Sequence, residues 1–306
     1  MRRFLLWCAR NEWLRVHIPR LPGAQRAVRR FMPGEDMDDA LKAAGALQAK
    51  GIPSIFTHLG ENLTDLSQAD EVAGHYHELI TRFARWGLRP DVSPKLTQLG
   101  LDLDPDATFE HALGVARHTR EAGGRFWIDM EDSSYVDRTL DIYERLLAAQ
   151  PGIGVCIQAY LRRTPEDIER LRPLRASIRL VKGAYNEPAE RAFRSKTEVR
   201  KAYRDLSIEM LADASAGRMT LGLATHDVEL IEEIAAVASG SGIGRDAFEV
   251  QMLYGIRADQ QRRLRDEGYR VRVLIAYGEY WYPWYVRRLA ERPANLWFAV
   301  RQMIPW

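Results

Sequence analysis

Residues 178–184 (IRLVKGA), 220–227 (TLGLATHD) and 247–253 (AFEVQML) form three short apolar runs, and longer amphipathic stretches lie between them. Helical spacing is clearest in residues 227–239, whose recurring apolar positions are Val228, Leu230, Ile231, Ile234 and Ala235. Nearly continuous apolar runs that alternate with helices indicate a parallel sheet covered on both faces. This part of the chain therefore predicts consecutive strand–helix units.

The same alternation continues on both sides of this region. Five further strand-like runs are IPSIFTHLG (52–60), DVSPKLT (91–97), RFWIDME (125–131), GIGVCIQAY (152–160) and VRVLIAYG (271–278). Helix-like stretches cover about 65–86, 107–121, 134–149, 164–172, 187–213, 227–239, 258–267 and 279–292. Eight strand–helix units over roughly 250 residues predict an α/β fold of the (β/α)8 TIM-type barrel.

An open doubly wound sheet is the competing architecture. Its nucleotide-binding turn should follow an early strand, whereas the nearest glycine-rich match, GSGIG at 240–244, follows a helix and precedes a strand. The barrel is therefore the better prediction. We expect residues 1–50 to form an N-terminal helical extension and residues 51–306 to form the barrel, with a short tail from 294.

The composition is that of a folded protein: 306 residues, a formal net charge of +2, 46% hydrophobic and 28% charged residues. The near-neutral charge argues against a nucleic-acid-binding protein. No apolar run reaches the roughly 18 residues that a transmembrane helix needs. Cys8 and Cys156 are too few and too far apart for a disulfide framework or a zinc site, so we expect a reducing, cytoplasmic compartment.

The first twenty residues, MRRFLLWCARNEWLRVHIPR, contain an apolar stretch of only six residues, from Phe4 to Ala9. A secretory signal needs a longer apolar core, so an amphipathic helix is the better prediction. We expect this helix to pack on the main domain. Contact with a membrane surface is the alternative.

Active sites of such barrels lie at the carboxyl ends of the strands. The polar residues at these positions are His58, Glu61, Lys95, Asp129, Glu131, Asp132, Gln158, Arg179, Lys182, Thr225, His226, Asp227 and Gln251, followed by Arg287, Arg288 and Glu291 after the last strand. A core does not need so many charges, because a buried charge costs several kcal/mol unless it is paired. The pattern therefore predicts a functional site at this end of the barrel.

Plainer interpretations of these residues stay open. Lys95, Asp129 and Arg179 could form a structural network of ion pairs. Lys182 could be an imine-forming lysine, although the following Gly-Ala-Tyr resembles a backbone turn that approaches a ligand. The histidines lack the spacing of a metal-binding motif, so no metal is predicted. The Arg287–Arg288 doublet could be a solvated pair beside an aromatic packing face.

Eight sequence blocks, in this order and spacing, resemble the proline dehydrogenase family. They are LGE (59–61), the lysine of SPKLT (93–97), IDMED (128–132), IQAY (157–160), IRLVKGAY (178–185), ATHD (224–227), FEVQMLYG (248–255) and YGEYWYPWYVRRLAERPAN (277–295). Within this family, the chain resembles the small monofunctional bacterial enzymes. The resemblance implies a distorted (β/α)8 barrel that binds FAD. It implies oxidation of L-proline to Δ1-pyrroline-5-carboxylate, the first step toward glutamate, with a membrane quinone as acceptor and a peripheral membrane contact.

The resemblance also implies roles for single residues. Arg287 and Arg288 would bind the substrate carboxylate, for which guanidinium groups are suited, with Lys95 as a third cation. Asp129 would pair with Lys95 as an acidic catalytic residue. Arg179 would lie beside the flavin ring and favour negative charge on its reduced form. The other matches are Leu253 and Trp284 in the substrate pocket, Glu61 as a gate, and Met130, Gln158, Arg179, Val181, Lys182, Gly183, Ala184, Thr225, His226 and Glu291 as FAD contacts.

Three positions depart from the family pattern: Leu274 and Trp284 stand where tyrosine is usual, and Asn186 stands where tryptophan often follows KGAY. These departures concern the walls of the substrate pocket. Two rival functions remain. One is a lyase or aldolase that uses Lys182 or Lys95 as an imine-forming amine. The other is a non-enzymatic relative that binds a partner through its basic N-terminal helix and aromatic tail.

Overall fold

The computed structural model describes residues 4–5, 7–8, 11–20, 28–29, 31–60 and 63–291. The strands are β1 (Ser54–His58), β2 (Trp127–Ile128), β3 (Gly154–Gln158), β4 (Ser177–Val181), β5 (Thr220–Ala224), β6 (Phe248–Leu253) and β7 (Arg270–Tyr277). The main helices are α2 (Glu12–His17), α4 (Met37–Gln48), α5 (Leu66–Arg85), α6 (Pro105–Glu121), α7 (Val136–Ala149), α8 (Thr164–Leu171), α9 (Lys196–Ser215), α10 (Val228–Gly240), α11 (Ala258–Asp266) and α12 (Trp281–Glu291).

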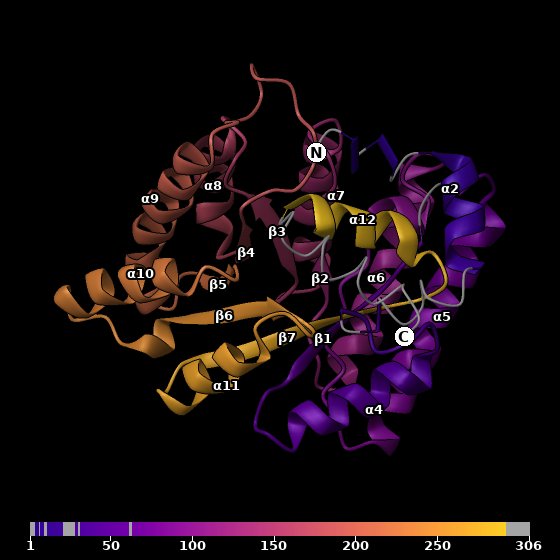
Figure 1. Cartoon of the computed structure of the whole chain (residues 1–306), viewed down its shortest axis with the longest axis horizontal. Helices are drawn as coiled ribbons and strands as arrows, with labels where there is room; N and C mark the ends of the chain where they lie inside the picture. Colours follow the sequence, from indigo (N-terminus) through magenta and orange to yellow (C-terminus); the bar gives the residue numbers. More distant parts are fainter. Residues whose placement is uncertain are drawn as a thin grey trace, which may run out of the picture.

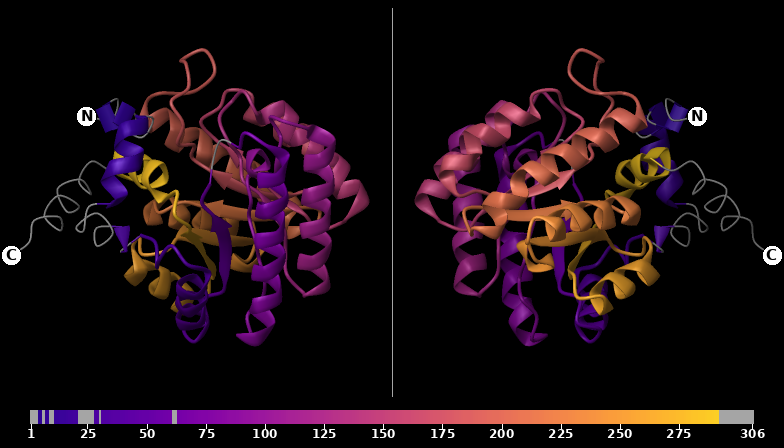
Figure 2. Two further views of the ribbon diagram at one scale, coloured as in Figure 1. Left: turned by 90° about the vertical axis from the view of Figure 1, so that its right-hand side faces the viewer. Right: turned by 90° about the vertical axis from the view of Figure 1, so that its left-hand side faces the viewer.

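The seven strands form one parallel sheet in the order β1-β7-β6-β5-β4-β3-β2, so from β2 to β7 each strand pairs with the next one along the chain, and β7 pairs with β1. Apart from α12, the helices that follow the strands cover the outside of the curled sheet (Figures 1 and 2). Nearly every strand residue is buried, because its two faces meet the barrel interior and the helices. The α/β barrel predicted from the sequence is confirmed.

The eighth strand-like run, residues 91–97, lies where the barrel closes but is not a regular strand. Val92 pairs with Phe56 of β1 on one side and with Phe126, just before β2, on the other. Pro90 and Pro94 flank this pairing. Proline has no N–H to donate, so the segment pairs through isolated bridges, at Val92 and again at Lys95, and not through a continuous ladder. The prediction of eight strands is therefore right about position and wrong about regularity in this segment.

The helix predicted at 187–213 begins later, at Lys196, and this part of the prediction is wrong. Ser195 is the N-cap, and its hydroxyl accepts a hydrogen bond from the N–H of Glu198 at 3.2 Å. Before it, the chain forms an antiparallel bridge between Ala192 and Leu161. The connection from β4 to α9 is thus a long loop, which projects at the top of Figures 1 and 2.

The N-terminal segment packs against α12 in a hydrophobic cluster separate from the main core. Leu5, Cys8, Phe31 and other apolar residues from this segment meet the aromatic face of α12. Trp281, 1% exposed, donates its indole N–H to Glu35 at 2.7 Å. The two segments lie side by side in both views of Figure 2. Within the described part of the chain, no helix is both long and apolar enough to cross a bilayer.

Candidate active site

Arg179 on β4 is the centre of the site and is only 3% exposed. Its Nε donates to Oε1 of Gln251 at 2.7 Å, and its Nη1 donates to Asp129 at 2.7 Å and to the Ser93 hydroxyl at 3.0 Å. The guanidinium also lies over the ring of Trp127, 4.7 Å from its centroid. These partners come from β6, from β2 and the residue after it, and from residues 91–97, so a charge that would be costly to bury alone is paired and hydrogen-bonded.

Several buried polar atoms at this end of the barrel lack a hydrogen-bond partner among the described residues. They include Nη2 of Arg179 and Oε1 of Gln158. The Gln158 amide is nevertheless anchored, since its Nε2 donates to the carbonyl of Glu131 at 2.9 Å. Buried polar groups are almost always satisfied, so a donor and an acceptor left over in one site point to a polar ligand.

Lys95 and Asp129 lie side by side, because their backbones form a parallel bridge at the closing edge of the barrel. The ion pair that the structure records for the Asp129 carboxylate is with Arg179, and Ser93 donates to the same oxygen at 2.7 Å. Asp129 and Arg179 thus form an ion pair, and the backbone of Lys95 lies beside that of Asp129. Ser93 and Trp127 also contact Arg179, but sequence reasoning missed them because neither type signals chemistry by itself.

Polar contacts connect the carboxyl ends of β4, β5 and β6. Lys182 forms an ion pair with Asp227 at 2.7 Å, and Asp227 also caps α10. Burial alone would raise the pKa of Asp227, but the hydrogen bond and charge of Lys182 lower it below its ordinary value. Nε2 of His226 accepts from the N–H of Leu253 at 3.4 Å. An ammonium held by an ionised carboxylate suits electrostatic binding better than imine formation.

The chain turns sharply at Gly183, directly after β4. Its φ is +99°, and a Cβ here would lie 2.1 Å from the ring of Tyr160. Only glycine tolerates both constraints, so the backbone at Lys182 and Ala184 can approach a ligand closely. Val181 is the last residue of β4, and Met130 and Thr225 lie just beyond the carboxyl ends of β2 and β5.

The predicted substrate residues divide into two groups. Leu253 and Leu274 pack against the cluster that contains Trp284, which is 8% exposed. Arg287, Arg288 and Glu291 lie on α12, which crosses the barrel in Figure 1, but their side chains lie outside the described part of the structure. Glu61, the predicted gate, also falls outside the described residues.

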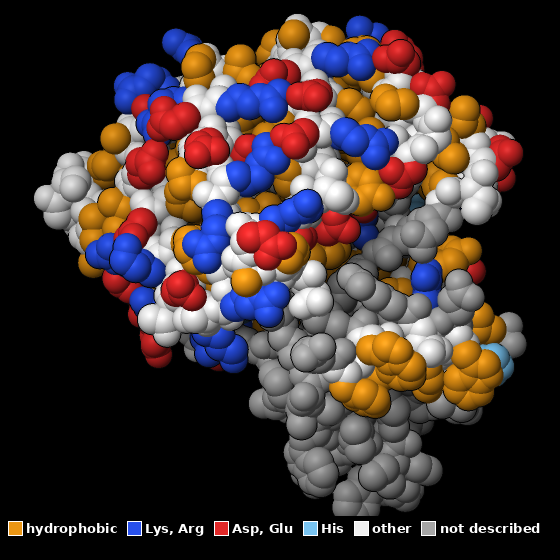
Figure 3. Space-filling model, turned by 90° about the horizontal axis from the view of Figure 1, so that it is seen from above, with side chains coloured by type: hydrophobic (Ala, Val, Ile, Leu, Met, Phe, Trp, Pro, Cys, Tyr) orange, Lys and Arg blue, Asp and Glu red, His pale blue; other side chains and the backbone are white. Residues whose placement is uncertain are grey.

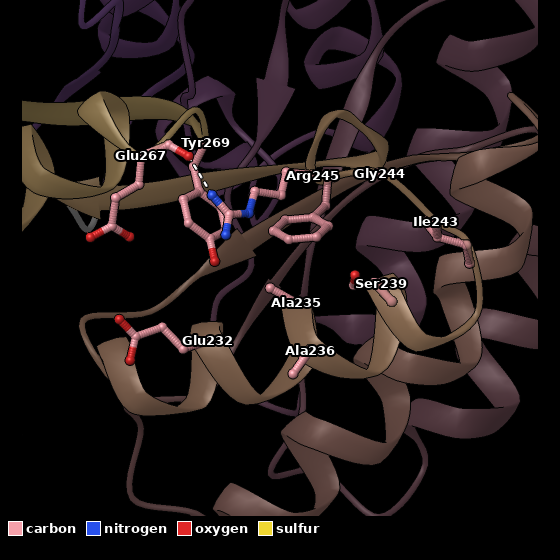
Figure 4. Close-up of a pocket in the computed structure, with 11 residues that line it drawn as sticks. Glu232, Ala235, Ala236, Ser239, Ile243, Gly244, Arg245, Glu267 and Tyr269 are labelled. Atoms are coloured by element: carbon pink, nitrogen blue, oxygen red, sulfur yellow. Dashed lines mark hydrogen bonds between the residues drawn. The ribbon is translucent and has the colours of Figure 1, made fainter.

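A cavity of about 460 Å³ lies elsewhere, at the amino ends of β6 and β7 (Figure 4). Its walls include Glu232 and Ala235 of α10 together with Tyr269, over whose ring Arg245 lies at 4.6 Å. Arg245 also donates to the carbonyl of Glu267. The cavity is remote from the strand ends that carry Arg179. In this fold such a position is associated with stability rather than catalysis.

Comparison with known proteins agrees with the motifs. The family model described as "Proline dehydrogenase" matches residues 40–301. The chain is 39% identical to proline dehydrogenase of Deinococcus radiodurans over 280 residues, 90% of this chain and 89% of that protein. It is 34% identical to proline dehydrogenase 1 of Bacillus subtilis strain 168 over 305 residues, 99% of each.

The structural likeness extends to larger proteins. The crystal structure of proline utilization A from Bdellovibrio bacteriovorus superposes with a TM-score of 0.81 at 23% identity. The match covers 94% of this chain and 38% of that one, and at this identity it shows the fold alone. The same distorted barrel is therefore present in both. With the family model and relatives at 34–39% identity over nearly the whole length, the chain belongs to the proline dehydrogenase family.

Proposed function

We propose that this protein oxidises L-proline to Δ1-pyrroline-5-carboxylate with FAD as cofactor and a quinone as electron acceptor. Family membership supports proline oxidation. FAD binding is supported by two buried atoms that have no hydrogen-bond partner among the described residues, Nη2 of Arg179 and Oε1 of Gln158. One is a donor and the other an acceptor, which suits the edge of a flavin ring. Residues 1–50 would be a helical extension on the catalytic barrel of 51–306.

FAD, when bound, would supply the hydride acceptor. Arg179 would place a positive charge beside it, held by Asp129 and Gln251 so that the charge does not reorganise during the reaction. Other residues would hold the cofactor by contacts to its ring, ribityl chain and diphosphate; these are Met130, Gln158, Val181, Lys182, Gly183, Ala184, Thr225, His226 and Glu291. Gly183 contributes by leaving its backbone open to a ligand.

The substrate carboxylate would lie against α12. Arg287 and Arg288 follow one another there, and Lys95 reaches the same end of the barrel. Guanidinium forks bind carboxylates in a bidentate manner. Leu253 and Trp284 would form the apolar walls, Asp129 would keep the neighbouring cations in place, and Glu61 would gate the entrance.

The cofactor is tested on the purified protein. It should be yellow, and its oxidised-flavin absorbance should bleach when L-proline is added without oxygen. A colourless protein that cannot be reconstituted with FAD would contradict the proposal. A borohydride-trapped lysine adduct would favour the rival lyase.

The carboxylate site is tested with Arg288→Met and Arg287→Met. The carboxylate is charged in both the ground and transition states, so the loss should appear in KM rather than kcat. Removing one of two guanidiniums from a closed pocket costs on the order of 3–5 kcal/mol, which raises KM by roughly two to three and a half powers of ten. FAD content should stay unchanged. A near-normal KM for proline would place the carboxylate elsewhere.

We further propose that the N-terminal segment brings the enzyme to the cytoplasmic face of the membrane, where the quinone resides. Phe4, Trp7 and Trp13 are 57–63% exposed, although their neighbours Leu5 and Cys8 are buried. Figure 3 shows hydrophobic side chains gathered at the lower right of the molecule, where this segment lies. Residues 1–20 also carry five arginines and one glutamate. Aromatic residues beside cations are typical of helices that lie in a bilayer interface.

Cosedimentation with anionic vesicles tests this surface. Trp7→Glu combined with Trp13→Glu should lower vesicle binding, while activity with a soluble dye acceptor stays unchanged. Trp86→Glu is the matched control, since Trp86 is 43% exposed but lies at the end of α5. Equal binding by the double variant and the control would contradict this role.

A further inference from the structure

A line of polar side chains crosses the barrel interior below Arg179. Nε of Arg179 donates to Gln251 at 2.7 Å, and Nε2 of Gln251 donates to Oε1 of Glu249 at 2.9 Å. Arg272 donates to the same Glu249 oxygen at 2.9 Å and to Asp91 at 2.6 Å. Gln251 is 5% exposed and Asp91 1%, and the side chains of Arg272 and Glu249 are 12% and 16% exposed. A row of charges this deep in a barrel is costly, so its presence calls for a function.

The row gives the Gln251 amide a single orientation. Arginine can only donate hydrogen bonds and an ionised carboxylate can only accept them, so Oε1 must face Arg179 and Nε2 must face Glu249. Burial alone would raise the pKa of Glu249, but the charge of Arg272 and the hydrogen bond from Gln251 lower it below its ordinary value. The carboxylate is therefore ionised at neutral pH.

The neighbouring strand leaves room for this amide. Gly222 on β5 lies beside Gln251, and a Cβ at position 222 would stand 3.0 Å from Nε2 of Gln251. Its φ is outside the left-handed region, so backbone conformation does not require glycine here. The requirement is space for the amide.

We propose that Gln251 and Glu249 are positioning residues for the reaction: they fix the Arg179 guanidinium so that its Nη2 faces the cofactor. Gln251 holds Nε while Asp129 and Ser93 hold Nη1, which leaves Nη2 as the buried donor without a protein partner among the described residues. Glu249, anchored by Arg272, which in turn pairs with Asp91, acts on Arg179 through Gln251. This inference rests on the proposed flavin function.

Gln251→Met is the first test, because it replaces one neutral side chain by another of similar length. Arg179 should lose one of its fixed contacts, and the midpoint potential of the bound flavin should become more negative. The rate of flavin reduction by proline should fall about ten- to hundredfold, as expected for a misplaced catalytic group, while KM for proline changes less than about twofold. The FAD content should be retained. Gly222→Ala should shift both quantities in the same direction by displacing the amide.

Glu249→Gln distinguishes a positioning role from a direct electrostatic effect, because the two predict opposite changes in the midpoint potential of the flavin. Loss of a nearby negative charge alone would make the flavin easier to reduce and raise its potential. Loss of positioning makes the potential fall, which is the expected result. Asp213→Asn is the control: this carboxylate is also buried and paired with two arginines, but it lies at the far end of α9. The control should lower the melting temperature without changing potential or rate.

Two results would overturn the inference. One is a Gln251→Met protein with the wild-type potential and reduction rate, whatever its melting temperature. The other is a rise in potential for Glu249→Gln. If the Glu249→Gln protein fails to fold, Gln251→Met and Gly222→Ala still test the inference, because both variants leave the ion pairs of Arg272 with Glu249 and Asp91 intact. Failure of the wild-type protein to bind FAD would instead contradict the proposed function.

Discussion

Gly183 shows how one missing side chain shapes the site. Its positive φ and the nearby Tyr160 ring exclude a Cβ for two separate reasons. We expect Gly183→Ala to lower the free energy of unfolding by more than the 1–2 kcal/mol that a left-handed backbone costs an alanine. FAD affinity should fall as well, because the 182–184 backbone must move.

Gly217→Ala is the matched control for this prediction. Gly217 also has a positive φ of 68°, but a Cβ there would have nothing within 4 Å. The control should therefore show the backbone cost without the steric cost or the loss of FAD. Urea unfolding and flavin titration measure the two quantities. Equal stability losses in the two variants would mean that Tyr160 moves freely out of the way.

His58, at the end of β1, links burial to pH dependence. Burial, helped by the charge of His75, lowers the pKa of His58 to about 4 from an ordinary value of 6.5. Between these values only the unfolded chain binds the proton, so stability is fully present above pH 6.5 and falls as the pH drops toward 4. From pH 7 to pH 5 this should cost about 2 kcal/mol. Urea titrations of wild type and His58→Gln test it; equal losses in both would contradict it.

At the scale of elements, α12 is the helix whose placement matters most for the proposed substrate site. Trp281 anchors it through one hydrogen bond to Glu35, far away in sequence. Glu35→Ala would leave a buried indole N–H unsatisfied, which costs about 1–3 kcal/mol. Because α12 carries the arginine pair, we expect KM for proline to rise while kcat changes less.

Glu35→Gln keeps an acceptor at the same place and should retain most of the wild-type affinity for proline. Thermal melting and steady-state kinetics on the three proteins provide the comparison. An unchanged KM for Glu35→Ala would show that other contacts of the N-terminal segment suffice to hold α12.

At the scale of the whole molecule, the two hydrophobic clusters predict two levels of stability. The barrel core is continuous from α4 to β7, whereas α12 and the N-terminal residues form their own smaller cluster. Segments with fewer buried contacts open more readily. Hydrogen exchange should therefore be faster in α12 than in β3–β6.

Leu289→Ala sharpens this prediction. Leu289 is 5% exposed within the smaller cluster, and such a truncation costs about 2–5 kcal/mol. Exchange in α12 should accelerate while the barrel strands keep their protection, which mass spectrometry of exchanged peptides would show. One common rate for α12 and the strands would mean that the protein opens as a single unit.

The local sequence predicts most of the strands and helices and the end of the barrel at which the candidate site lies. Apolar periodicity predicts the strands and most helix bounds, because it reflects which side of each element is buried. Polar residues after the strands predict the end of the barrel that carries the candidate site, and the structure pairs Asp129 with Arg179 there. Parallel strands place these residues at one edge, which is why their position along the chain was informative.

Other features depend on contacts that no local pattern encodes. Arg179 meets Ser93 and Gln251 across 86 and 72 residues of chain, so its partners emerge only when the sheet closes. The irregular edge at Val92 and the late start of α9 follow from proline and from pairing with distant segments. Local sequence therefore determined most of the elements and pointed to the end of the barrel that carries the candidate site. Tertiary structure alone decided the partner of each buried charge, because a charge is stabilised by whatever the fold brings within a few ångströms.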